Sequence, residues 1–547
     1  MAEGNSRTIL DLLDNAASIG NAKIRFLPDD ASEYSLSEII SAAHSAAGWW
    51  LSKASSGSRV SVVMPTSFDG LAVAFGAWLA GLTLVSLPHP SKGVTPEQYL
   101  STLEDMCKLA ESKVIVIERA YSELLPRLPM VAIDFFDSYK GTPPLKVIAG
   151  GGELIQFTSG ATAEPKAVVL GMEAIGNSVS GCLDVLGPRE QEAAVSWLPL
   201  SHDMGFIGIC LTALAATGPP WSTRGSLTLI RPEEFLRDPR IWMKTCSDFG
   251  ATITAAPNFA LAIATRLLRA GGPTLDLSAL RTFIIGAETI RPDTLRDFAT
   301  VARPHGFSEL SFCPAYGLAE ATLAVTLVPP ETMWSTTEIE FESDSPSSNM
   351  STVEWQNAFS GRKVVSCGKP IPGIEVRIKD DASIGQIEIM GSSLLTRYAG
   401  HEQAAASESG WFQTGDIGML CNSELFVFGR GDDVLIIRGR NFSPETFEAI
   451  AGEHPLIRAG NCVAIPDGEG DYVIVAEIKK VANITGEELE TCCREIRVAL
   501  AKTYGAGPSR VVLIQHNSMP KTASGKLQRS KVARCLLMDE LVIAASS

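Results

Sequence analysis

The chain has 547 residues, more than one hydrophobic core usually supports, so we expect at least two domains. Hydrophobic residues make up 45% and charged residues 20% of the chain, a balance that excludes an intrinsically disordered protein. The formal net charge of −16 disfavours nucleic acid as a partner, because nucleic-acid-binding proteins normally present a basic surface.

Cysteine usage and the N-terminus predict a cytoplasmic protein. The eleven cysteines show no CxxC pair and no metal-ligand spacing, and Cys492 and Cys493 are the only close pair, so we expect reduced thiols. The start of the chain, MAEGNSRTILDLLDN, lacks the basic residues and apolar core of a signal peptide. An uncharged run covers residues 71–87, close to the ~20 residues that span a bilayer. Gly81 interrupts this run, so it favours a buried helix followed by a strand, without a membrane span.

The first two-thirds of the chain alternates short apolar runs with longer helical patterns. The stretch LSEIISAAHSAAGWWLSKA is typical of a helix. The apolar runs are continuous, as in parallel strands that helices cover on both faces. They are VSVVM (60–64), VIVI (114–117), MVAI (130–133) and LIQFT (154–158). The predicted fold class is therefore α/β, with sheets built from βαβ units and covered by helices.

Two changes of composition divide the rest of the chain. Residues 331–361 are polar and rich in Ser and Thr, which predicts a surface loop or insertion. After about residue 430 a new pattern begins with DVLIIRGRNFSPETFEAI, a strand, a turn and a helix, and strands CVAIPD and YVIVAEI follow. We predict a large N-terminal domain over 1–432 and a smaller α+β domain over 433–547, with GRGDD as the hinge.

A candidate phosphate-binding loop follows the strand LIQFT. The segment QFTSGATAEPKAVVL offers hydroxyl groups, closely approaching backbone N–H groups and the cation of Lys166, which together suit phosphate oxygens. It is not a Walker A loop, because GxxxxGK[ST] is absent. A plain turn between two strands would explain this segment about equally well.

Further motifs follow in a fixed order, and together they resemble the adenylate-forming superfamily of acyl-CoA synthetases, peptide-synthetase adenylation domains and luciferases. The motifs are SWLPLSHDMGFIG (196–208), IIGAETI (284–290), PAYGLAEATL (314–323), SCGKPIPG (366–373), GWFQTGDIG (410–418), GRGDDVLIIRGRNFSPETFE (429–448) and PKTASGKLQR (520–529). The forms HDMGFIG, YGLAEATL and RGRNFSPETFE are most similar to fatty acyl-AMP ligases. The long interval between YGLAE and CGKP also matches those ligases and is filled by residues 331–361.

The resemblance implies a function and a mobile C-terminal domain that acts as a lid. ATP would activate a fatty acid to acyl-AMP with release of pyrophosphate, and the acyl group would pass to the phosphopantetheine thiol of an acyl carrier protein. The insertion at 331–361 would disfavour the domain arrangement that CoA needs. The cofactors implied are ATP and Mg²⁺, and we expect a monomer.

The resemblance also assigns roles to individual residues. Glu320 matches the magnesium ligand, and Lys526 matches the lysine that contacts the reacting carboxylate and the α-phosphate. Asp433 matches the hinge position. The nucleotide would be bound by Thr158, Ser159, Gly160, Thr162, Lys166, Gly286, Ala287, Glu288, Tyr316, Gly317, Asp416 and Arg430, of which Asp416 and Arg430 would hold the ribose. The acyl-pocket candidates are His202, Asp203, Met204 and Gly205.

Four of these residues, Glu320, Asp416, Lys526 and His202, also have a purely structural interpretation. A lone glutamate usually caps or solvates a helix, and an aspartate after glycine is usually a turn residue. The basic residues around Lys526 would ordinarily form a solvated face, and His202 could satisfy a local hydrogen bond. Only the motifs together favour the functional roles of Lys526, Glu320 and Asp416.

The match is imperfect in the phosphate loop and at the hinge. Ala161 removes a hydroxyl group that many family members have, while Ala163 and Ala167 replace glycines, and these departures bear on how tightly pyrophosphate is bound. Asp432 stands where lysine is frequent. An acyl-CoA or aryl-CoA ligase of the same superfamily remains an alternative, since the same residues would serve it. A non-catalytic binding module is disfavoured, because such a module has no need of the lysine.

Overall fold

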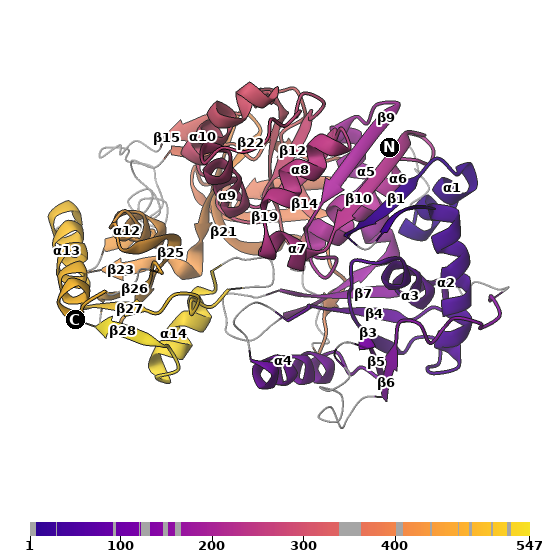
Figure 1. The fold of residues 1–547 in the computed structure, drawn as a ribbon, viewed down its shortest axis with the longest axis horizontal. Helices are drawn as coiled ribbons and strands as arrows, with labels where there is room; N and C mark the ends of the chain where they lie inside the picture. Colours follow the sequence, from indigo (N-terminus) through magenta and orange to yellow (C-terminus); the bar gives the residue numbers. More distant parts are fainter. Residues whose placement is uncertain are drawn as a thin grey trace.

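The computed structural model describes residues 7–28, 30–90, 95–119, 121, 132–145, 151–158, 166–338, 363–400, 409–437, 440–468, 470–480, 484–504, 507–521 and 527–546. Two large sheets with helices between and around them form the body, and a smaller lobe at the C-terminal end lies beside it (Figure 1). The predicted α/β class is confirmed.

The first large sheet carries the early apolar runs. It has seven strands, in the order β20 (Arg397–Tyr398), β8 (Lys166–Gly171), β7 (Glu153–Thr158), β4 (Thr83–Leu87), β3 (Arg59–Val63), β5 (Val114–Ile117) and β6 (Ala132–Phe135). Strands β7, β4, β3, β5 and β6 pair in parallel, as the continuous runs predict. The pair β7–β8 is antiparallel, so these two consecutive strands form a hairpin. This connection differs from the βαβ units expected throughout the domain.

Helices cover both faces of this sheet. Val62 and Leu84 pack toward the core that contains helices α2 (Leu36–Leu51) and α3 (Phe68–Leu79), whereas Val63 and Val85 pack toward α4 (Pro96–Leu109). Helix α2 begins with a capping box in which Ser35 and Glu38 satisfy each other's backbone N–H groups. The apolar run at 71–87 forms most of α3 followed by β4, as predicted. In the described residues, no helix is long and apolar enough to cross a membrane.

The second large sheet has nine strands. Their order is β17 (Lys369–Pro370), β14 (Ala324–Leu327), β13 (Phe312–Gly317), β12 (Thr282–Ile285), β11 (Ile253–Ala256), β9 (Gln191–Ser196), β10 (Arg224–Ile230), β1 (Lys23–Leu27) and β2 (Asp30–Ser35). Strands β13, β12, β11, β9, β10 and β1 are parallel, so their carboxyl ends lie at one edge. The associated helices are α1 (Ile9–Ile19), α5 (Met172–Leu186), α6 (Thr212–Ala215), α7 (Pro232–Arg237), α8 (Arg240–Asp248), α9 (Asn258–Arg269) and α10 (Pro292–Ala302).

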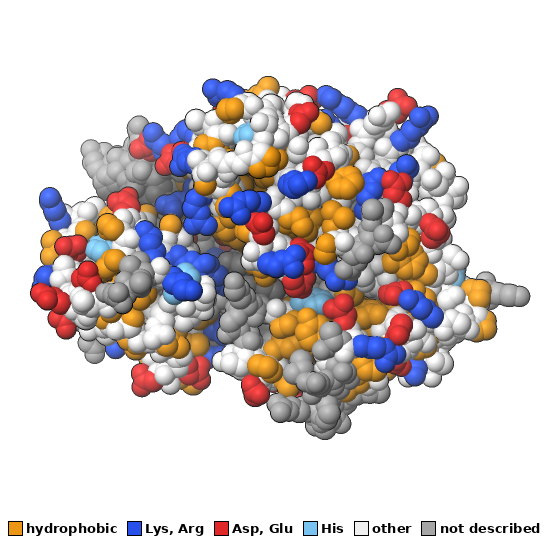
Figure 2. All heavy atoms as spheres, viewed as in Figure 1, with side chains coloured by type: hydrophobic (Ala, Val, Ile, Leu, Met, Phe, Trp, Pro, Cys, Tyr) orange, Lys and Arg blue, Asp and Glu red, His pale blue; other side chains and the backbone are white. Residues whose placement is uncertain are grey.

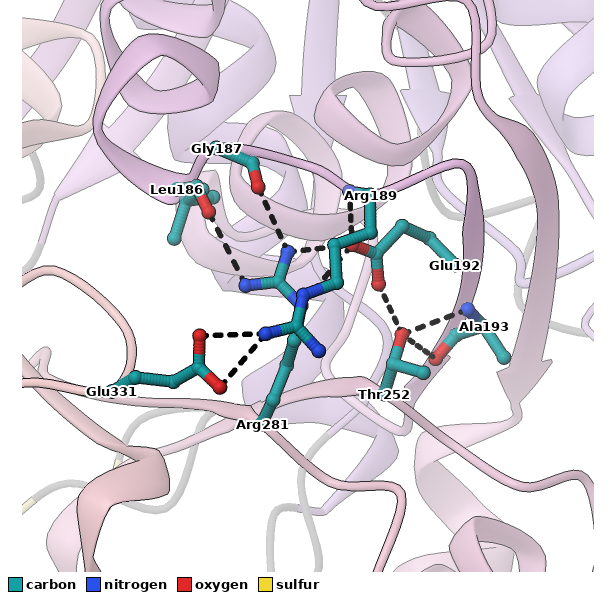
Figure 3. A network of polar contacts seen from close by, with 8 residues as sticks. All are labelled: Leu186, Gly187, Arg189, Glu192, Ala193, Thr252, Arg281 and Glu331. Carbon is teal, nitrogen blue, oxygen red and sulfur yellow. Dashed lines mark hydrogen bonds and ion pairs between the residues drawn. The ribbon is translucent and has the colours of Figure 1, made fainter.

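A buried ion pair fixes the opposite, amino-terminal edge of the second sheet (Figure 3). Arg281 donates to Glu192 from Nε at 3.2 Å and from Nη2 at 2.5 Å, and both side chains are buried. Thr252 donates to the other oxygen of Glu192, which joins the starts of β9, β11 and β12. Arg189 reaches Glu331 at 2.7 Å and ties down the chain where the predicted insertion begins.

Part of the predicted insertion is a strand. Strand β15 (Thr336–Glu338) pairs with β16 (Lys363–Val365), although the polar sequence gave no strand pattern. Residues 339–361 of the insertion lie outside the described segments. A separate antiparallel sheet follows, in the order β18 (Ile374–Ile378), β19 (Gly385–Gly391), β21 (Phe412–Cys421) and β22 (Glu424–Arg430).

The C-terminal lobe has its own hydrophobic cores on the two faces of a four-stranded sheet. The predicted strand–turn–helix pattern is present as β23 (Leu435–Ile437), β24 (Arg440–Phe442) and α12 (Pro444–Gly452). The sheet contains β25 (Ile457–Pro466), β26 (Tyr472–Ile478), β27 (Arg510–Ile514) and β28 (Ile543–Ser546), with helices α13 (Gly486–Tyr504) and α14 (Arg529–Leu537). All eleven cysteines lie in described segments and are free thiols, as expected, and ten of them are buried.

Candidate active site

One cleft of about 2840 Å³ brings the motifs together. It lies at the carboxyl ends of parallel strands, namely β4 and β7 of the first sheet and β11, β12 and β13 of the second, where α/β proteins usually bind ligands. The C-terminal lobe closes its remaining side, and Figure 2 shows Lys and Arg side chains where that lobe borders the body. Of the described residues that the sequence assigned to the site, all but Gly205 line this cleft.

A chain of three polar residues forms the wall where the ribose is expected. Tyr316 donates its hydroxyl hydrogen to Oδ2 of Asp416 at 2.6 Å. Arg430 pairs with Asp416 across strands β21 and β22, and its Nε lies 3.8 Å from Oδ1. Burial raises the pKa of Asp416, while Arg430 and the Tyr316 hydroxyl oppose this rise by favouring the ionised form. Asp416 therefore keeps one oxygen, Oδ1, beside a cation as an acceptor for a ligand.

The predicted adenine pocket is a turn at the carboxyl end of β12. Ala287 adopts a positive φ of 68°, a conformation that residues other than glycine rarely adopt. Glu288 accepts a hydrogen bond from the backbone N–H of Phe259 at 2.5 Å, which fixes the turn against helix α9. Gly286 faces the backbone of β13, where a Cβ atom would lie 3.1 Å from the carbonyl oxygen of Ala315. The turn is thus held from two neighbouring elements and presents its backbone to the cleft.

Glu320 lies in the short turn η5 (Ala319–Ala321) between β13 and β14. Its Oε1 accepts a hydrogen bond from the hydroxyl of Tyr398 at 2.9 Å. Thr322, two residues after Glu320, has a φ of 69°, which is a strained conformation for a β-branched residue. Its hydroxyl donates to the carbonyl oxygen of Ser393 at 2.6 Å and so helps to hold the strained turn in place.

The candidate phosphate loop is described only at its two ends. Thr158 closes β7 and Lys166 opens β8, and the two residues face each other in the strand register. Ser159, Gly160 and Thr162 lie outside the described segments. In the described part, the hydroxyl of Thr158 and the buried side-chain amide of Gln156 make no hydrogen bond, although both residues line the cleft. A hydrogen bond from a polar ligand to such groups is favourable, because the free-energy cost of removing them from water has already been incurred on folding.

The acyl-pocket candidates lie at the start of a π-helical segment, η2 (Met204–Leu211), a rare geometry that occurs frequently at functional sites. The backbone N–H of Met204 donates to Oδ1 of Asp203 at 2.6 Å, and Nδ1 of His202 lies 3.3 Å from the same nitrogen. Gly205 allows the backbone of this segment to pack closely against Pro199, since a Cβ atom there would lie 2.2 Å from the carbonyl oxygen of Pro199. The adjoining wall is apolar and suits an alkyl or aryl chain. It contains Ile209, Ala255, Phe259, Ala262, Ile263, Ile284, Leu323 and Leu327.

Lys526 lies outside the described segments, but the residues on both sides of 522–526 are placed. Lys521 and Leu527 form an antiparallel bridge, and both line the cleft. Burial lowers the pKa of Lys521, whereas the negative charges of Glu477 and Glu288 raise it. Glu288 of the candidate adenine pocket lines the same cleft, so this end of the C-terminal lobe borders the cleft that contains the nucleotide-site candidates.

The residues present fit a magnesium ion that is bound together with phosphate. The described residues contain no group of three or more His, Cys, Asp or Glu side chains that could hold a metal alone. Mg²⁺ usually binds one or two carboxylates and completes its coordination with phosphate oxygens and water. Glu320 would supply one carboxylate, and Lys166 and Thr158 line the same cleft, where phosphate oxygens would complete the coordination.

Comparison with known proteins shows the family and the fold. Residues 17–399 match the family model described as AMP-binding enzyme. The 4-hydroxyphenylalkanoate adenylyltransferase of Mycobacterium bovis is 30% identical over 584 residues, covering 96% of this chain and 90% of the relative. The long-chain-fatty-acid–AMP ligase FadD26 of the same species is 30% identical over 517 residues, covering 87% and 86%. A solved structure from a study of fatty acyl-adenylate ligases from E. coli and L. pneumophila superposes with a TM-score of 0.86 at 25% identity, covering 97% and 98%.

The fold and the cleft are those of an acyl-adenylate-forming ligase. Because the family match covers more than half of its length, the chain belongs to the AMP-binding enzyme family, whose members use ATP. The fold does not distinguish the acceptor of the acyl group. The anthranilate CoA ligase AuaEII also superposes, with a TM-score of 0.71 at 18% identity.

Proposed function

We propose that this enzyme activates a fatty acid as acyl-AMP and then transfers the acyl group to the phosphopantetheine thiol of an acyl carrier protein. The observation that supports this proposal is the single cleft in which the nucleotide-site candidates and an apolar wall meet. Asp416, Arg430 and the turn at Gly286 offer polar contacts, whereas Phe259, Ile263 and Leu323 suit a hydrocarbon chain. The two relatives at 30% identity are named for adenylation of long-chain fatty acids and of hydroxyphenylalkanoates, which are both carboxylic acids with an apolar tail.

In the first step, the carboxylate oxygen attacks the α-phosphorus of ATP, the bond to the bridging oxygen breaks, and pyrophosphate leaves. This chemistry depends on positioning and on neutralising charge. Asp416 and Arg430 orient the ribose, the turn at Gly286 holds adenine, and Lys526 contacts both reacting groups. A magnesium ion bound at Glu320 supplies charge neutralisation on the phosphate oxygens. In the second step, the thiol sulfur attacks the acyl carbonyl carbon and AMP leaves.

The proposed domain organisation follows the packing of the lobe. Residues 1–432 form the adenylating domain and 433–547 the mobile lid, with Asp433 as the hinge. The hinge candidate lies in η7 (Gly431–Asp433), one residue before β23, the first strand of the lobe. Independent cores on the two sides of this point support a boundary here.

Product analysis tests the proposal. The purified enzyme is incubated with a mid-length fatty acid, ATP, Mg²⁺ and CoA, and the products are identified by mass spectrometry. We expect acyl-AMP without acyl-CoA, and acyl transfer when a carrier protein bearing phosphopantetheine is added. Abundant acyl-CoA would instead establish the alternative, an acyl-CoA or aryl-CoA ligase. A matched reaction with 4-hydroxyphenylpropionate in place of the fatty acid distinguishes an alkyl from an aryl preference.

A further inference from the structure

We propose that Tyr398 is a positioning residue for the magnesium–triphosphate end of the cleft, where its hydroxyl group orients Glu320 and its ring orients Lys166. This inference rests on the proposed function, because it adopts the assignments of Glu320 to Mg²⁺ and Lys166 to phosphate. Tyr398 lies in no motif that the sequence singled out.

The backbone around Tyr398 connects the two halves of the site. The N–H of Leu395 donates to the carbonyl oxygen of Glu320 at 2.8 Å. One residue later, the N–H of Thr396 donates to the carbonyl oxygen of Val169 in β8 at 2.9 Å. Residues 395–398 therefore bond to the Glu320 turn at one end and, through β20, to the strand that begins with Lys166 at the other.

The side chain of Tyr398 makes the same connection. Its hydroxyl donates to Oε1 of Glu320 at 2.9 Å, and the Nζ atom of Lys166 lies 5.5 Å from the centre of its ring. A cation over an aromatic face is attracted by the negative charge of the ring's π-system. The preceding residue, Arg397, forms two hydrogen bonds with Glu153 of β7 at 2.8 and 2.9 Å, which fix the short strand that carries Tyr398.

This geometry has a consequence for metal binding. A carboxylate that accepts a hydrogen bond on one oxygen is restricted in its rotation, so less conformational freedom is lost when it binds a cation. Removing such an outer partner usually weakens metal affinity about 10- to 100-fold. The hydroxyl of Tyr398 should therefore act on metal affinity, and the ring should act on the lysine and on phosphate binding.

Two variants separate these effects. Tyr398→Phe removes the hydroxyl and keeps the ring, whereas Tyr398→Leu removes both. Binding of Mn²⁺, used as a spectroscopic probe for Mg²⁺, is measured by electron paramagnetic resonance in the presence of a non-hydrolysable ATP analogue. We expect Tyr398→Phe to raise the Kd of Mn²⁺ about 10-fold. Binding of the analogue without metal and the KM of the acid should stay unchanged in Tyr398→Phe, and metal-free analogue binding should weaken only in Tyr398→Leu.

The matched control is Tyr139→Phe. Tyr139 also donates to a carboxylate, Oδ1 of Asp69 at 2.7 Å, but it does not line the cleft. Equal Mn²⁺ affinity in Tyr398→Phe, Tyr139→Phe and the wild type would overturn the inference. Glu320→Gln separates the two levels of the argument. If that variant retains wild-type Mn²⁺ affinity, the metal assignment in the proposed function fails; if it loses affinity and Tyr398→Phe does not, only the role of Tyr398 fails.

Discussion

Arg529 and Asp433 form an ion pair in which Nη1 lies 3.1 Å from Oδ2, and this contact joins helix α14 to the predicted hinge residue. The same guanidinium bonds to Glu448 from Nε and Nη2, both at 2.9 Å, and to Glu445 at 3.2 Å. Glu445 and Glu448 belong to helix α12 of the lobe itself. If the chain rotates at this predicted hinge, the contact with Asp433 is therefore the one of the three that we expect to change most directly.

Removing the Asp433 carboxylate should shift the balance between the two half-reactions. We expect the present arrangement, in which Lys521 of the lobe and Glu288 of the body line one cleft, to be the one that carries out adenylation. Asp433→Ala weakens it while Arg529 keeps both glutamates. We expect acyl-AMP formation to slow about 10-fold, which corresponds to 1.4 kcal/mol, relative to acyl transfer from preformed acyl-AMP. Single-turnover measurements of each half-reaction test this, and an equal effect on both would contradict the expectation that the Arg529–Asp433 contact favours the adenylating arrangement.

The pH dependence of ATP use should report the ionisation of Asp416. Burial raises its pKa above the ordinary value of 3.8, so the ionised form is lost at a higher pH than for a free aspartate. Tyr316→Phe removes a hydrogen bond that favours the ionised form, and the acidic limb of kcat/KM for ATP should move to higher pH. Stability should change with pH in the opposite direction to activity. Because the pKa of Asp416 is higher in the folded than in the unfolded chain, its ionisation lowers the free energy of unfolding as the pH rises from 3.8 through the pKa of the folded state. An acidic limb that stays fixed would contradict the assignment.

The ion pair between Arg281 and Glu192 should be essential for stability. Arg281→Met leaves the buried carboxylate of Glu192 without its cation, and loss of one partner in a buried pair usually costs about 3–5 kcal/mol. Urea denaturation measures the change in the free energy of unfolding. The control is Arg189→Gln, which removes an exposed pair with Glu331 in the same network and should cost no more than about 1 kcal/mol. Similar losses in the two variants would argue against a special role for the buried pair.

Shortening the insertion should widen the choice of acceptor. Glu338 and Lys363 face each other at the end of the β15–β16 ribbon, so residues 339–362 can be replaced by an Asn-Gly turn between them. If the insertion disfavours the CoA arrangement, the shortened enzyme should form acyl-CoA while keeping its rate of adenylation. Mass spectrometry of both products tests this expectation. Unchanged rejection of CoA by a shortened but active enzyme would count against the mechanism.

Lys526 should be required for adenylation but not for folding. Lys526→Ala removes the cation that is proposed to stabilise charge at the reacting centre, and we expect at least about a 10²-fold loss of acyl-AMP formation. Lys502→Ala, an exposed residue of helix α13, is the control and should be fully active. Circular dichroism and thermal unfolding should be unchanged in both variants. Undiminished adenylation by Lys526→Ala would remove this residue from the mechanism.

Local pattern was sufficient for many elements of the fold. The run from Val114 to Ile117 is strand β5, and the uncharged run at 71–87 forms most of α3 and then β4, because continuous apolar residues are stable where both faces are covered. Strand β15 could not be predicted from its polar sequence, because it has no apolar alternation and is stabilised by backbone pairing with β16. The antiparallel pairing of β7 and β8 was also missed, because strand direction depends on how a connection folds back.

The sequence by itself determined the family and the order of the motifs, since those depend on residue types at fixed spacings. Only the tertiary structure decided which side chains touch. Tyr398 meets Glu320 across 78 residues, Arg529 meets Asp433 across 96, and Tyr316 meets Asp416 across 100. The hydrophobic pattern of each element predicts that element alone and carries no information about these contacts. The contacts form because the parallel strands of both sheets end at one cleft and the C-terminal lobe borders it, which brings polar groups from distant parts of the chain within bonding distance.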